Sequence, residues 1–209
     1  MRCIDEFHKH YEHARIWENN YWLGSGCWKL PFDAFIIQEI IYQTRPEYII
    51  ETGTGHGGSA LFYASICELL GEGKVITIDI EGSRNDNNNQ FHWEDRITYL
   101  HGSSTNPIIY HDVEHICKGK RNMVILDSWH SYEHVCKELE MYEKLVLVGS
   151  YMIVEDTHVN GHPVPWPHGK GPYEAVDWFL STNADWEREY WPEKHLMSFN
   201  PGGYLRRAK

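Results

Sequence analysis

The residues with the clearest capacity for chemistry lie in one glycine-rich stretch, Glu51-Thr-Gly-Thr-Gly-His-Gly-Gly-Ser59. It follows an apolar, β-branched run that begins at Glu47, and it precedes a helical pattern, so it predicts a strand, a tight turn and a helix start. Glycines let the backbone take positive φ and approach a ligand closely, and the free N–H groups at a helix start attract a negative group. The stretch therefore predicts a cofactor site.

Two cofactor patterns overlap in this turn. Gly53, Gly55 and Gly58 match the dinucleotide pattern G-x-G-x-x-G. Glu51 followed by alternating glycines also matches the acidic-x-G-x-G-x-G pattern of class I methyltransferases, and an acidic side chain suits a methionine ammonium better than a pyrophosphate. Asp79 ends the next expected strand and suits ribose hydroxyls, but both folds use that device. S-adenosylmethionine is favoured, and an NAD(P)-dependent oxidoreductase stays as an alternative.

Three carboxylates follow the two expected strands that come later in the chain. Asp127 ends one of them, and Glu155 and Asp156 end the next. In a methyltransferase-type sheet these strands are neighbours, so the three side chains are expected to converge beside the glycine turn. Clustered carboxylates repel unless a cation or protons neutralise them, and oxygen ligands suit Mg²⁺ first, with Mn²⁺ or Ca²⁺ behind. The other interpretation is that they cap helices or face water.

His130 is the candidate general base. It lies three residues after Asp127, at the start of an expected helix. The helix N-terminus and a bound cation would both lower its pKa and keep the imidazole neutral, as a base requires. Alternatively it bonds only to backbone. Trp129 beside it indicates either packing or a wall on which a substrate stacks. Other histidines close by in the sequence compete for the role of base, namely His134, His158, His162 and His168.

Composition limits the classes of partner. The chain has 209 residues and a formal net charge of −11, which argues against nucleic acid or an anionic membrane as the main partner. We see no signal peptide and no apolar run as long as a membrane span. Five scattered cysteines form no C-x-x-C pair, so neither a zinc site nor a disulfide framework is predicted, and a cytoplasmic location fits best.

The elements that must position these residues alternate between strand and helix along the chain. Strands are expected at 47–51, 74–79, 97–100, 123–127 and 151–155, with helices between them, and a terminal strand is expected within 199–205. A helix over 5–19 and a loop over 24–31 precede a helix that Asp33 is expected to cap. An Asn-rich loop spans 82–89, and a Pro-, Gly-, His- and Trp-rich loop over 157–172 could cover a site. This order predicts an α/β fold with a doubly wound, parallel sheet in one domain, 1–209, of which 1–32 form an N-terminal helix and loop extension.

Five motifs taken together resemble a known family. In chain order they are Glu51-Thr-Gly-x-x-x-Gly-Gly-Ser59-Ala, Asp127-Ser-x-His130-Ser-x-Glu-His-Val135, Gly149-Ser-Tyr-x-x-Val-Glu155-Asp156-Thr157, Gly171-Pro-x-Glu-Ala-Val176 and Asn200-Pro-x-Gly-Tyr-Leu-Arg206. This combination resembles the cephalosporin hydroxylase family of class I methyltransferase-fold proteins, and it is similar to macrocin-type sugar O-methyltransferases around the acidic residues. The resemblance extends from about residue 20 to the end of the chain.

The resemblance implies a Rossmann-like class I methyltransferase fold, with a mostly parallel seven-stranded sheet and a C-terminal antiparallel strand. It implies a Mg²⁺-dependent O-methyltransferase that acts on a hydroxyl of a sugar or a glycosylated metabolite, with Asp127, Glu155 and Asp156 as metal ligands. His130 would be the catalytic base, assisted by Asp127. The expected S-adenosylmethionine contacts are Glu51, Gly53, Thr54, Gly55, Gly57, Gly58, Ser59, Asp79, Ser103 and Asp127.

The family also leaves alternatives open. It often has Asp where this chain has Trp129, which would reshape the acceptor pocket or remove a carboxylate from the metal region. A non-catalytic protein that works beside a hydroxylase partner is one alternative. An iron hydroxylase with two histidines and one carboxylate is another. The aromatic N-terminal segment could serve a homo-oligomer contact or core packing.

Overall fold

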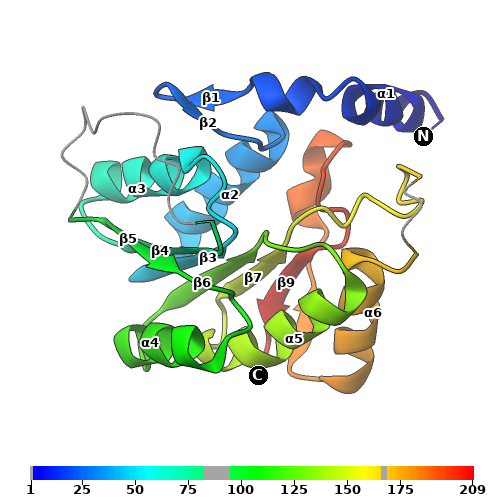
Figure 1. Ribbon diagram of the computed structural model, residues 1–209. Helices are drawn as coiled ribbons and strands as arrows, with labels where there is room; N and C mark the ends of the chain where they lie inside the picture. The colour runs from blue at the N-terminus through cyan, green and yellow to red at the C-terminus, as the bar shows by residue number, and fades with distance from the viewer. Residues whose placement is uncertain (1, 82–94, 166–168) are drawn as a thin grey trace.

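The computed structural model describes residues 2–81, 95–165 and 169–209. The chain begins with a helical and hairpin segment that precedes the main sheet (Figure 1). Its elements are α1 (Arg2–His13), the 3₁₀ helix η1 (Ile16–Asn19), and the short strands β1 (Tyr21–Trp22) and β2 (Ser25–Gly26), which pair with each other. The expected helix over 5–19 therefore ends at His13, because Arg15 takes a left-handed conformation before η1 begins.

The rest of the chain alternates between strands and helices as the sequence predicts. The strands are β3 (Tyr48–Thr52), β4 (Lys74–Asp79), β5 (Ile97–His101), β6 (Asn122–Leu126), β7 (Tyr151–Val154), β8 (Trp186–Arg188) and β9 (Tyr204–Arg207). The α-helices are α2 (Pro31–Thr44), α3 (Gly58–Leu70), α4 (Pro107–Cys117), α5 (Tyr132–Tyr142) and α6 (Pro172–Thr182), and the 3₁₀ helices are η2 (Glu143–Leu145) and η3 (Trp191–His195).

The seven strands form one sheet in the order β5-β4-β3-β6-β7-β9-β8. The first five are parallel, and β9 runs antiparallel to both of its neighbours. The predicted α/β class, the mostly parallel sheet and the C-terminal antiparallel strand are confirmed. The strand β8 was not predicted, because three residues with two charges carry no apolar run. The terminal strand begins at Tyr204, since the chain bends and turns over 199–202.

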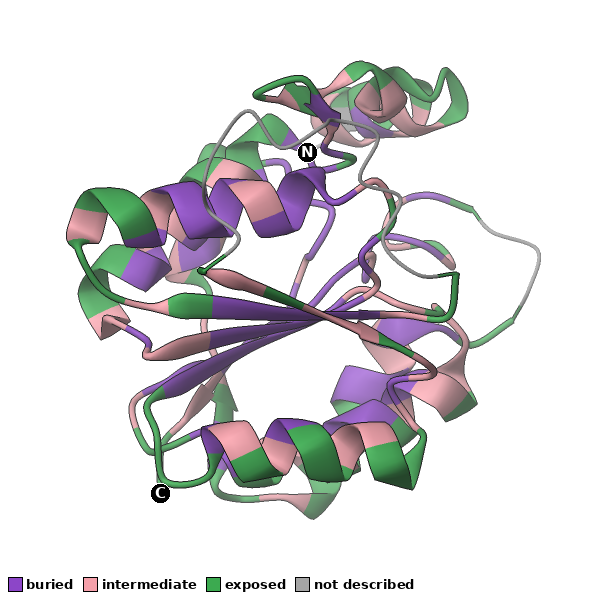
Figure 2. Ribbon diagram, turned by 60° about the vertical axis from the view of Figure 1, so that its left-hand side comes forward, coloured by how far each residue is buried: buried purple, intermediate pink, exposed green. Residues whose placement is uncertain are grey.

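Helices cover both faces of the sheet (Figure 2), and each face has its own apolar core. On one face α2 and α3 pack over Ile49, Met123 and Ile153. On the other face α4, α5 and α6 pack over the residues of opposite parity, such as Ile50 and Val124. Both faces of the central strands are therefore buried, which explains their continuous β-branched and apolar sequence.

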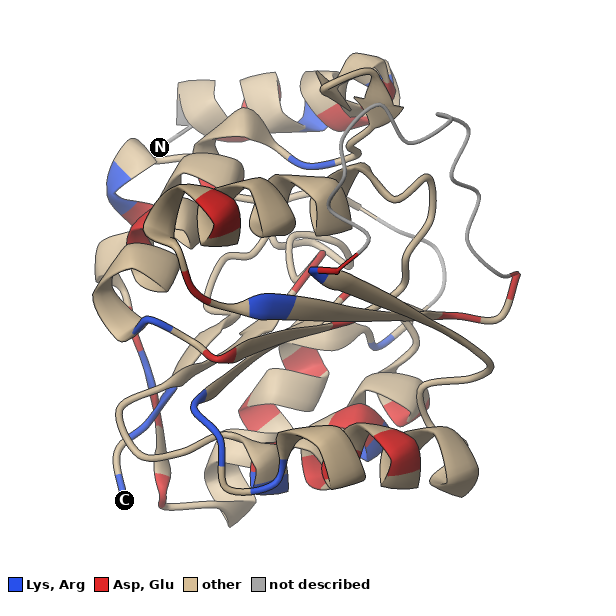
Figure 3. Cartoon of the chain, turned by 90° about the vertical axis from the view of Figure 1, so that its left-hand side faces the viewer, with Lys and Arg blue, Asp and Glu red and all other residues tan. Residues whose placement is uncertain are grey.

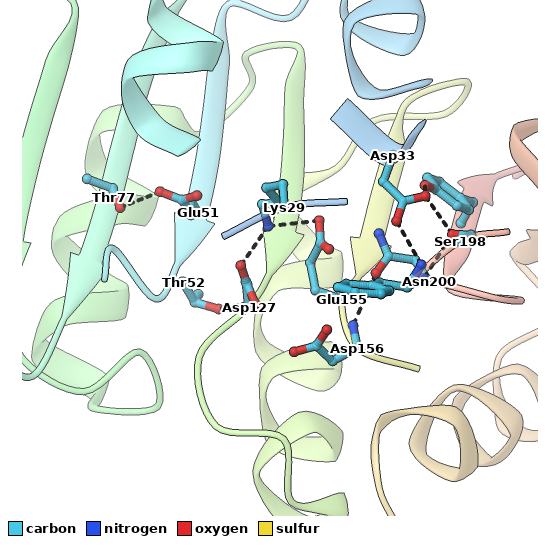
Figure 4. Close-up of polar contacts among 12 residues, drawn as sticks. Lys29, Asp33, Glu51, Thr52, Thr77, Asp127, Glu155, Asp156, Ser198 and Asn200 are labelled. Atoms are coloured by element: carbon cyan, nitrogen blue, oxygen red, sulfur yellow. Dashed lines mark hydrogen bonds and ion pairs between the residues drawn. The ribbon is translucent and has the colours of Figure 1, made fainter. Parts of the chain in front are cut away.

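The acidic residues at the strand ends also alternate between the two faces of the sheet. Side chains of a strand point to opposite faces in turn. Glu51, Asp127 and Glu155 continue the parity of Ile49, Ile125 and Ile153 and project to the α2–α3 side, whereas Asp156 continues the other parity. Figure 4 shows the first three in one row, with Asp156 set apart from them. The three expected metal ligands thus do not reach the site from one direction.

Asp33 is not the cap of α2. The residue at that position is Leu30, which makes no side-chain cap bond. Asp33 lies in the first helical turn, is fully buried, and accepts hydrogen bonds from Ser198 Oγ at 2.6 Å, from the Phe199 backbone N–H at 2.8 Å and from Tyr204 Oη at 2.9 Å. Its carboxylate instead holds the C-terminal turn against α2 (Figure 4). The Asn-rich stretch 82–89 lies outside the described residues.

Charged positions are mixed over the described part of the chain. In the view of Figure 3, Lys and Arg lie scattered among Asp and Glu. Several are paired at the start of the sheet, where Glu47 approaches Lys120 at 3.6 Å and Arg121 at 3.8 Å. Such exposed pairs contribute little to stability.

Candidate active site

One cavity of about 790 Å³ opens beside the carboxyl ends of the central parallel strands. Three groups of residues line it: the glycine turn after β3, the segment 127–131 after β6 and the segment 156–160 after β7. The N-terminal extension closes it with Glu12, Trp17, Trp28 and Lys29. A crevice at this edge is where doubly wound sheets bind their ligands.

The glycine turn is shaped by two close approaches. Gly53 has φ +87°, and a Cβ there would lie 1.9 Å from the Asp127 carbonyl oxygen, so only glycine fits between the ends of β3 and β6. A Cβ on Gly58 would lie 2.2 Å from the carbonyl oxygen of Gly26 in the N-terminal extension. Gly57, in a left-handed conformation, precedes α3 as its N-cap. The glycines therefore bring a bare backbone turn to the cavity edge.

Asp79 fixes the conformation of this turn from the end of β4. Its Oδ2 accepts hydrogen bonds from the backbone N–H groups of Thr54 at 2.9 Å and Gly55 at 3.0 Å, and its Oδ1 accepts from Glu81 at 2.8 Å. The carboxylate also lines the cavity. Oδ2 already accepts two of these hydrogen bonds, but Oδ1 accepts one of them and has a second lone pair, so Asp79 can hold the turn and still accept from a ligand hydroxyl through Oδ1.

Glu51 lies beneath the turn and has no exposed surface. Thr77 Oγ1 donates to Glu51 Oε2 at 2.7 Å, whereas Oε1 is buried without a hydrogen-bond partner. Burial raises the pKa of Glu51 to about 7, opposed by the Lys29 charge and by hydrogen bonds from Ser59 and Thr77. A carboxylate with one unsatisfied buried oxygen has the capacity to receive a cationic or hydrogen-bonding group.

The structure brings Asp127, His130 and Asp156 together as a possible metal-binding group. One ligand atom from each lies within 4.8 Å of the others, and all three side chains are half-buried at the cavity. His130 Nε2 lies 3.1 Å from Asp156 Oδ2. Asp156 is held in a left-handed conformation, φ +56°, by a hydrogen bond from its backbone N–H to Asn200 Oδ1. This turn aims Asp156 toward His130.

Glu155 is not part of that group, because its carboxylate points to Lys29. The Lys29 Nζ lies 2.6 Å from Asp127 Oδ2 and 3.0 Å from Glu155 Oε1, between the two carboxylates (Figure 4). Burial raises the pKa of Asp127 and of Glu155, and the lysine charge opposes both shifts. The neutralising cation that the acidic residues require is thus supplied in part by the chain itself.

Two of the histidines that compete with His130 for the role of base, His134 and His162, contact other side chains. His134 Nε2 lies 2.9 Å from Ser128 Oγ, which in turn donates to the buried Glu138 at 2.7 Å. His162 Nε2 lies 2.8 Å from Glu174 Oε1. His168 lies outside the described residues.

His158 lines the cavity but is nearly fully buried. Its Nδ1 donates to the Phe199 carbonyl at 2.9 Å, and its Nε2 lies 3.4 Å from Glu12. Burial alone would lower its pKa, but hydrogen bonding to Glu12 and the charge of Asp156 raise it overall. His158 already uses Nδ1 for the Phe199 carbonyl and faces Glu12 through Nε2, so His130 is the histidine with the geometry for the role of base.

Aromatic side chains form the outer part of the cavity. Trp129 is 69% exposed and lines the cavity, so it is not a core residue. Trp28 contacts Trp17 edge-on at 5.3 Å and His56 at 4.5 Å between ring centroids. Val159, Asn160 and Lys170 of the long loop also line it. Broad, partly exposed aromatic faces suit a ligand with one apolar surface.

The remaining predicted cofactor residues lie close to this cavity in different ways. Thr54, Gly55 and Ser59 line it directly. Gly57 and Gly58 shape the helix start behind it. Ser103 does not line it, and its Oγ lies 3.1 Å from Thr105 Oγ1. Sequence reasoning missed Lys29, Glu12 and Asn160, since none stands in a motif with local spacing.

No helix in the described ranges 2–81, 95–165 and 169–209 is long and apolar enough to cross a membrane.

The sheet order, the antiparallel strand and the glycine turn define a class I methyltransferase fold, and solved structures agree. A structure of CmcI with Mg and SAM superimposes with a TM-score of 0.70 over 92% of this chain and 78% of that one, at 18% identity. The O-methyltransferase TomG from Streptomyces achromogenes gives 0.57 over 86% and 80%, at 17% identity. At these identities the likeness concerns the fold.

The chain belongs to the rhamnosyl O-methyltransferase/CmcI family, whose sequence profile matches residues 14–208. It is 35% identical over 211 aligned residues to a rhamnosyl O-methyltransferase of Mycobacterium tuberculosis, covering 97% of this chain and 84% of that protein. The corresponding protein of Mycobacterium leprae is 34% identical over 208 residues, covering 97% and 90%. The family predicted from the five motifs is confirmed. The alternative of an NAD(P)-dependent oxidoreductase gains no support from these comparisons.

Proposed function

We propose that this protein is a Mg²⁺-dependent O-methyltransferase that uses S-adenosylmethionine to methylate a hydroxyl group of a sugar. The observation that carries the proposal is the shared cavity: the glycine turn and Asp79 line one part of it, and Asp127, His130 and Asp156 converge in another. Membership of the rhamnosyl O-methyltransferase/CmcI family supports the same reaction.

The residues around the glycine turn fit S-adenosylmethionine. The cradle at Gly53 has no room for a Cβ, Asp79 offers carboxylate lone pairs to ribose hydroxyls, and Glu51 holds an unpaired buried oxygen below the turn. The cofactor supplies an electrophilic methyl group on a sulfonium centre. When the cofactor is bound, Glu51 would offer a carboxyl oxygen to its cationic methionine part, and Asp79 would accept hydrogen bonds from its ribose hydroxyls.

The acidic residues fit a hard divalent cation. Asp127 and Asp156 offer carboxylate oxygens within one small cluster, and Glu155 is linked to Asp127 through Lys29. We propose Asp127, Glu155 and Asp156 as the metal-binding carboxylates, with Glu155 joining the other two once its contact with Lys29 is released. A Mg²⁺ ion held by these carboxylates would supply Lewis-acid chemistry that lowers the pKa of an acceptor hydroxyl.

His130 is proposed as the general base. His130 Nε2 lies 3.1 Å from Asp156 Oδ2, and an Nε2–H directed at that carboxylate would leave the lone pair on Nδ1. Nδ1 would then take the proton of the acceptor hydroxyl. The acceptor oxygen would gain the methyl group as the methyl–sulfur bond breaks, and S-adenosylhomocysteine would leave. Asp127 and Asp156 hold the acceptor and His130 in one geometry, which is the main contribution a protein can make to an in-line transfer.

The acceptor is proposed to be a sugar of a glycosylated small molecule, in line with the rhamnosyl O-methyltransferases to which the chain is similar. Trp129 and Trp28 present partly exposed faces to the cavity, and the apolar face of a pyranose can pack on such rings. A deoxysugar such as rhamnose has a methyl group in place of a hydroxymethyl, which favours this aromatic part of the cavity.

We also propose that the protein works in the cytoplasm. Its five cysteines are all free, and three of them are buried in the fold as thiols. Unpaired cysteines are typical of a reducing compartment.

The proposed function is tested by following S-adenosylhomocysteine formation with simple rhamnosides as acceptors. Product should form with Mg²⁺ and a rhamnoside, and mass spectrometry should find one added methyl group on the sugar. Binding of S-adenosylmethionine without turnover on any sugar would support the non-catalytic alternative. Binding of NAD in place of S-adenosylmethionine, measured by calorimetry, would exclude the methyltransferase function altogether.

A further inference from the structure

Lys29 is a buried cation at the centre of the acidic site. Its side chain is 4% exposed, and its Nζ lies 2.6 Å from Asp127 Oδ2 and 3.0 Å from Glu155 Oε1. The backbone of Lys29 is fixed as well, since Asn20 Nδ2 donates to its carbonyl at 2.9 Å and its own N–H donates to the Cys27 carbonyl at 2.8 Å. The ammonium is therefore held in place by the N-terminal extension.

The strand ends require such a cation. Glu51, Asp127 and Glu155 project to the same face of the sheet, and Glu51 and Glu155 are almost completely buried. Buried carboxylates without a partner are strongly unfavourable. Among the described residues, Lys29 is the only Lys or Arg side chain within 4.0 Å of Asp127 or Glu155.

Asp127 could bind either Lys29 or a metal ion, because it also belongs to the possible metal-binding group with His130 and Asp156. An ammonium 2.6 Å from one Asp127 oxygen repels a divalent cation that binds the same carboxylate. The Glu155 carboxylate is directed at Lys29 and not at the cluster. The contacts of Lys29 and a fully coordinated metal therefore oppose each other.

We propose that Lys29 is a built-in counter-ion that stabilises the metal-free site and competes with the divalent cation for Asp127 and Glu155. This inference rests on the proposed function for the presence of the metal. Lys29 keeps the carboxylates separated and the fold stable when no metal is bound, and it weakens metal affinity to a level at which the ion can exchange.

The test compares Lys29→Met with the wild type and with two controls. Lys29→Arg retains the positive charge, and Lys194→Met removes a half-exposed lysine that bonds to Glu39 at 2.7 Å, away from the site. The melting temperature of each full-length protein is measured in EDTA and in saturating MgCl₂ or MnCl₂. Calorimetric titration with MnCl₂ alone gives the metal affinity.

We expect the melting temperature of metal-free Lys29→Met to fall by roughly 10 °C or more, because one change leaves the buried Glu155 and the half-buried Asp127 without their cation. Saturating metal should recover most of that loss, and Mn²⁺ should bind at least about tenfold more tightly than to the wild type, because one repelling charge is gone. Lys194→Met should match the wild type in both measurements, and Lys29→Arg should bind Mn²⁺ with nearly wild-type affinity.

Equal or weaker Mn²⁺ binding by Lys29→Met would overturn the inference. If the wild type binds no ion and the variant binds one, the metal dependence of the proposed function is refuted, while the competition between Lys29 and the cation is supported. If neither binds, both fail.

A variant that does not fold in either buffer is replaced by a measurement on the wild type. The side-chain ammonium signal of Lys29, assigned by its loss in Lys29→Arg, is followed by nitrogen-15 NMR during a MgCl₂ titration. The inference requires that signal to shift as the metal binds, while that of Lys194 stays constant. A Lys29 signal that does not change at saturating Mg²⁺ would overturn it.

Discussion

Gly53→Ala should disable the cofactor site more severely than its one added methyl group suggests. A Cβ added to Gly53 would lie 1.9 Å from the Asp127 carbonyl oxygen and 2.6 Å from the carbonyl carbon. Neither partner can move freely, because the Gly53 N–H donates to Ile78 at 2.8 Å and the Asp127 N–H donates to Thr52 at 3.0 Å. To reach ordinary van der Waals distance, the turn and the end of β6 must separate by more than about 1 Å.

The chain offers a matched control in Gly149. Its φ is +86° against +87° for Gly53, and a Cβ at Gly149 would have nothing within 4 Å. Gly149→Ala should therefore lower the free energy of unfolding only by the cost of a left-handed alanine, about 1–2 kcal/mol. Gly53→Ala should add an overpacking cost of about 1–3 kcal/mol to that.

Denaturant unfolding and calorimetry with S-adenosylmethionine test both parts. A displaced turn should weaken cofactor binding by about 100-fold, equivalent to nearly 3 kcal/mol, whereas Gly149→Ala should bind as the wild type does. Gly53→Ala with normal cofactor affinity and a stability loss no larger than that of Gly149→Ala would refute the claim that the Asp127 backbone leaves no room for a side chain at Gly53.

Three further predictions concern His130, Asp156 and Asp33. His130→Ala should lower turnover by about 10²–10⁴-fold with little change in cofactor or metal affinity by calorimetry; lost metal binding would make His130 a ligand instead. Asp156→Asn should raise the metal concentration needed for activity while the melting temperature stays near the wild-type value, because one anionic ligand becomes neutral; an unchanged metal requirement would remove Asp156 from the site. Burial, reinforced by the charge of Glu155, raises the pKa of Asp33 to about 7. Its protonated form therefore contributes stability that is full below about pH 4 and is lost as pH rises through 7. The unfolding free energy of the wild type relative to Asp33→Asn should fall by up to about 4 kcal/mol over that range in metal-free buffer, and a constant difference would contradict the shift.

The sequence predicts the sheet well because its signals are local. The β-branched runs, the glycine turn and the alternation with helices each appear within short windows, and all agree with one parallel fold. The cavity at the carboxyl edge follows from that topology. Trp129 could not be assigned, because a tryptophan beside a strand end serves packing or a ligand equally well, and only its 69% exposure separates the two.

Residues with distant partners could not be predicted. Asp33 matches the residue type of a helix cap, but its partners lie 165 to 171 residues away and draw it into the core. Lys29 is an isolated lysine in a loop, and Asp127 lies 98 residues further on. Side-chain parity could have separated Glu155 from Asp156, since consecutive residues of a strand face opposite sides. Only the three-dimensional arrangement shows that a lysine fills the space between the carboxylates.

The most direct test of the proposed function measures methyl transfer from S-adenosylmethionine to a rhamnoside with and without divalent metal. We expect S-adenosylhomocysteine and an O-methylated sugar in equal amounts when Mg²⁺ is present, almost none in EDTA, and full recovery when Mg²⁺ is restored. An unchanged rate of sugar methylation in EDTA would contradict the role assigned to Asp127, Glu155 and Asp156.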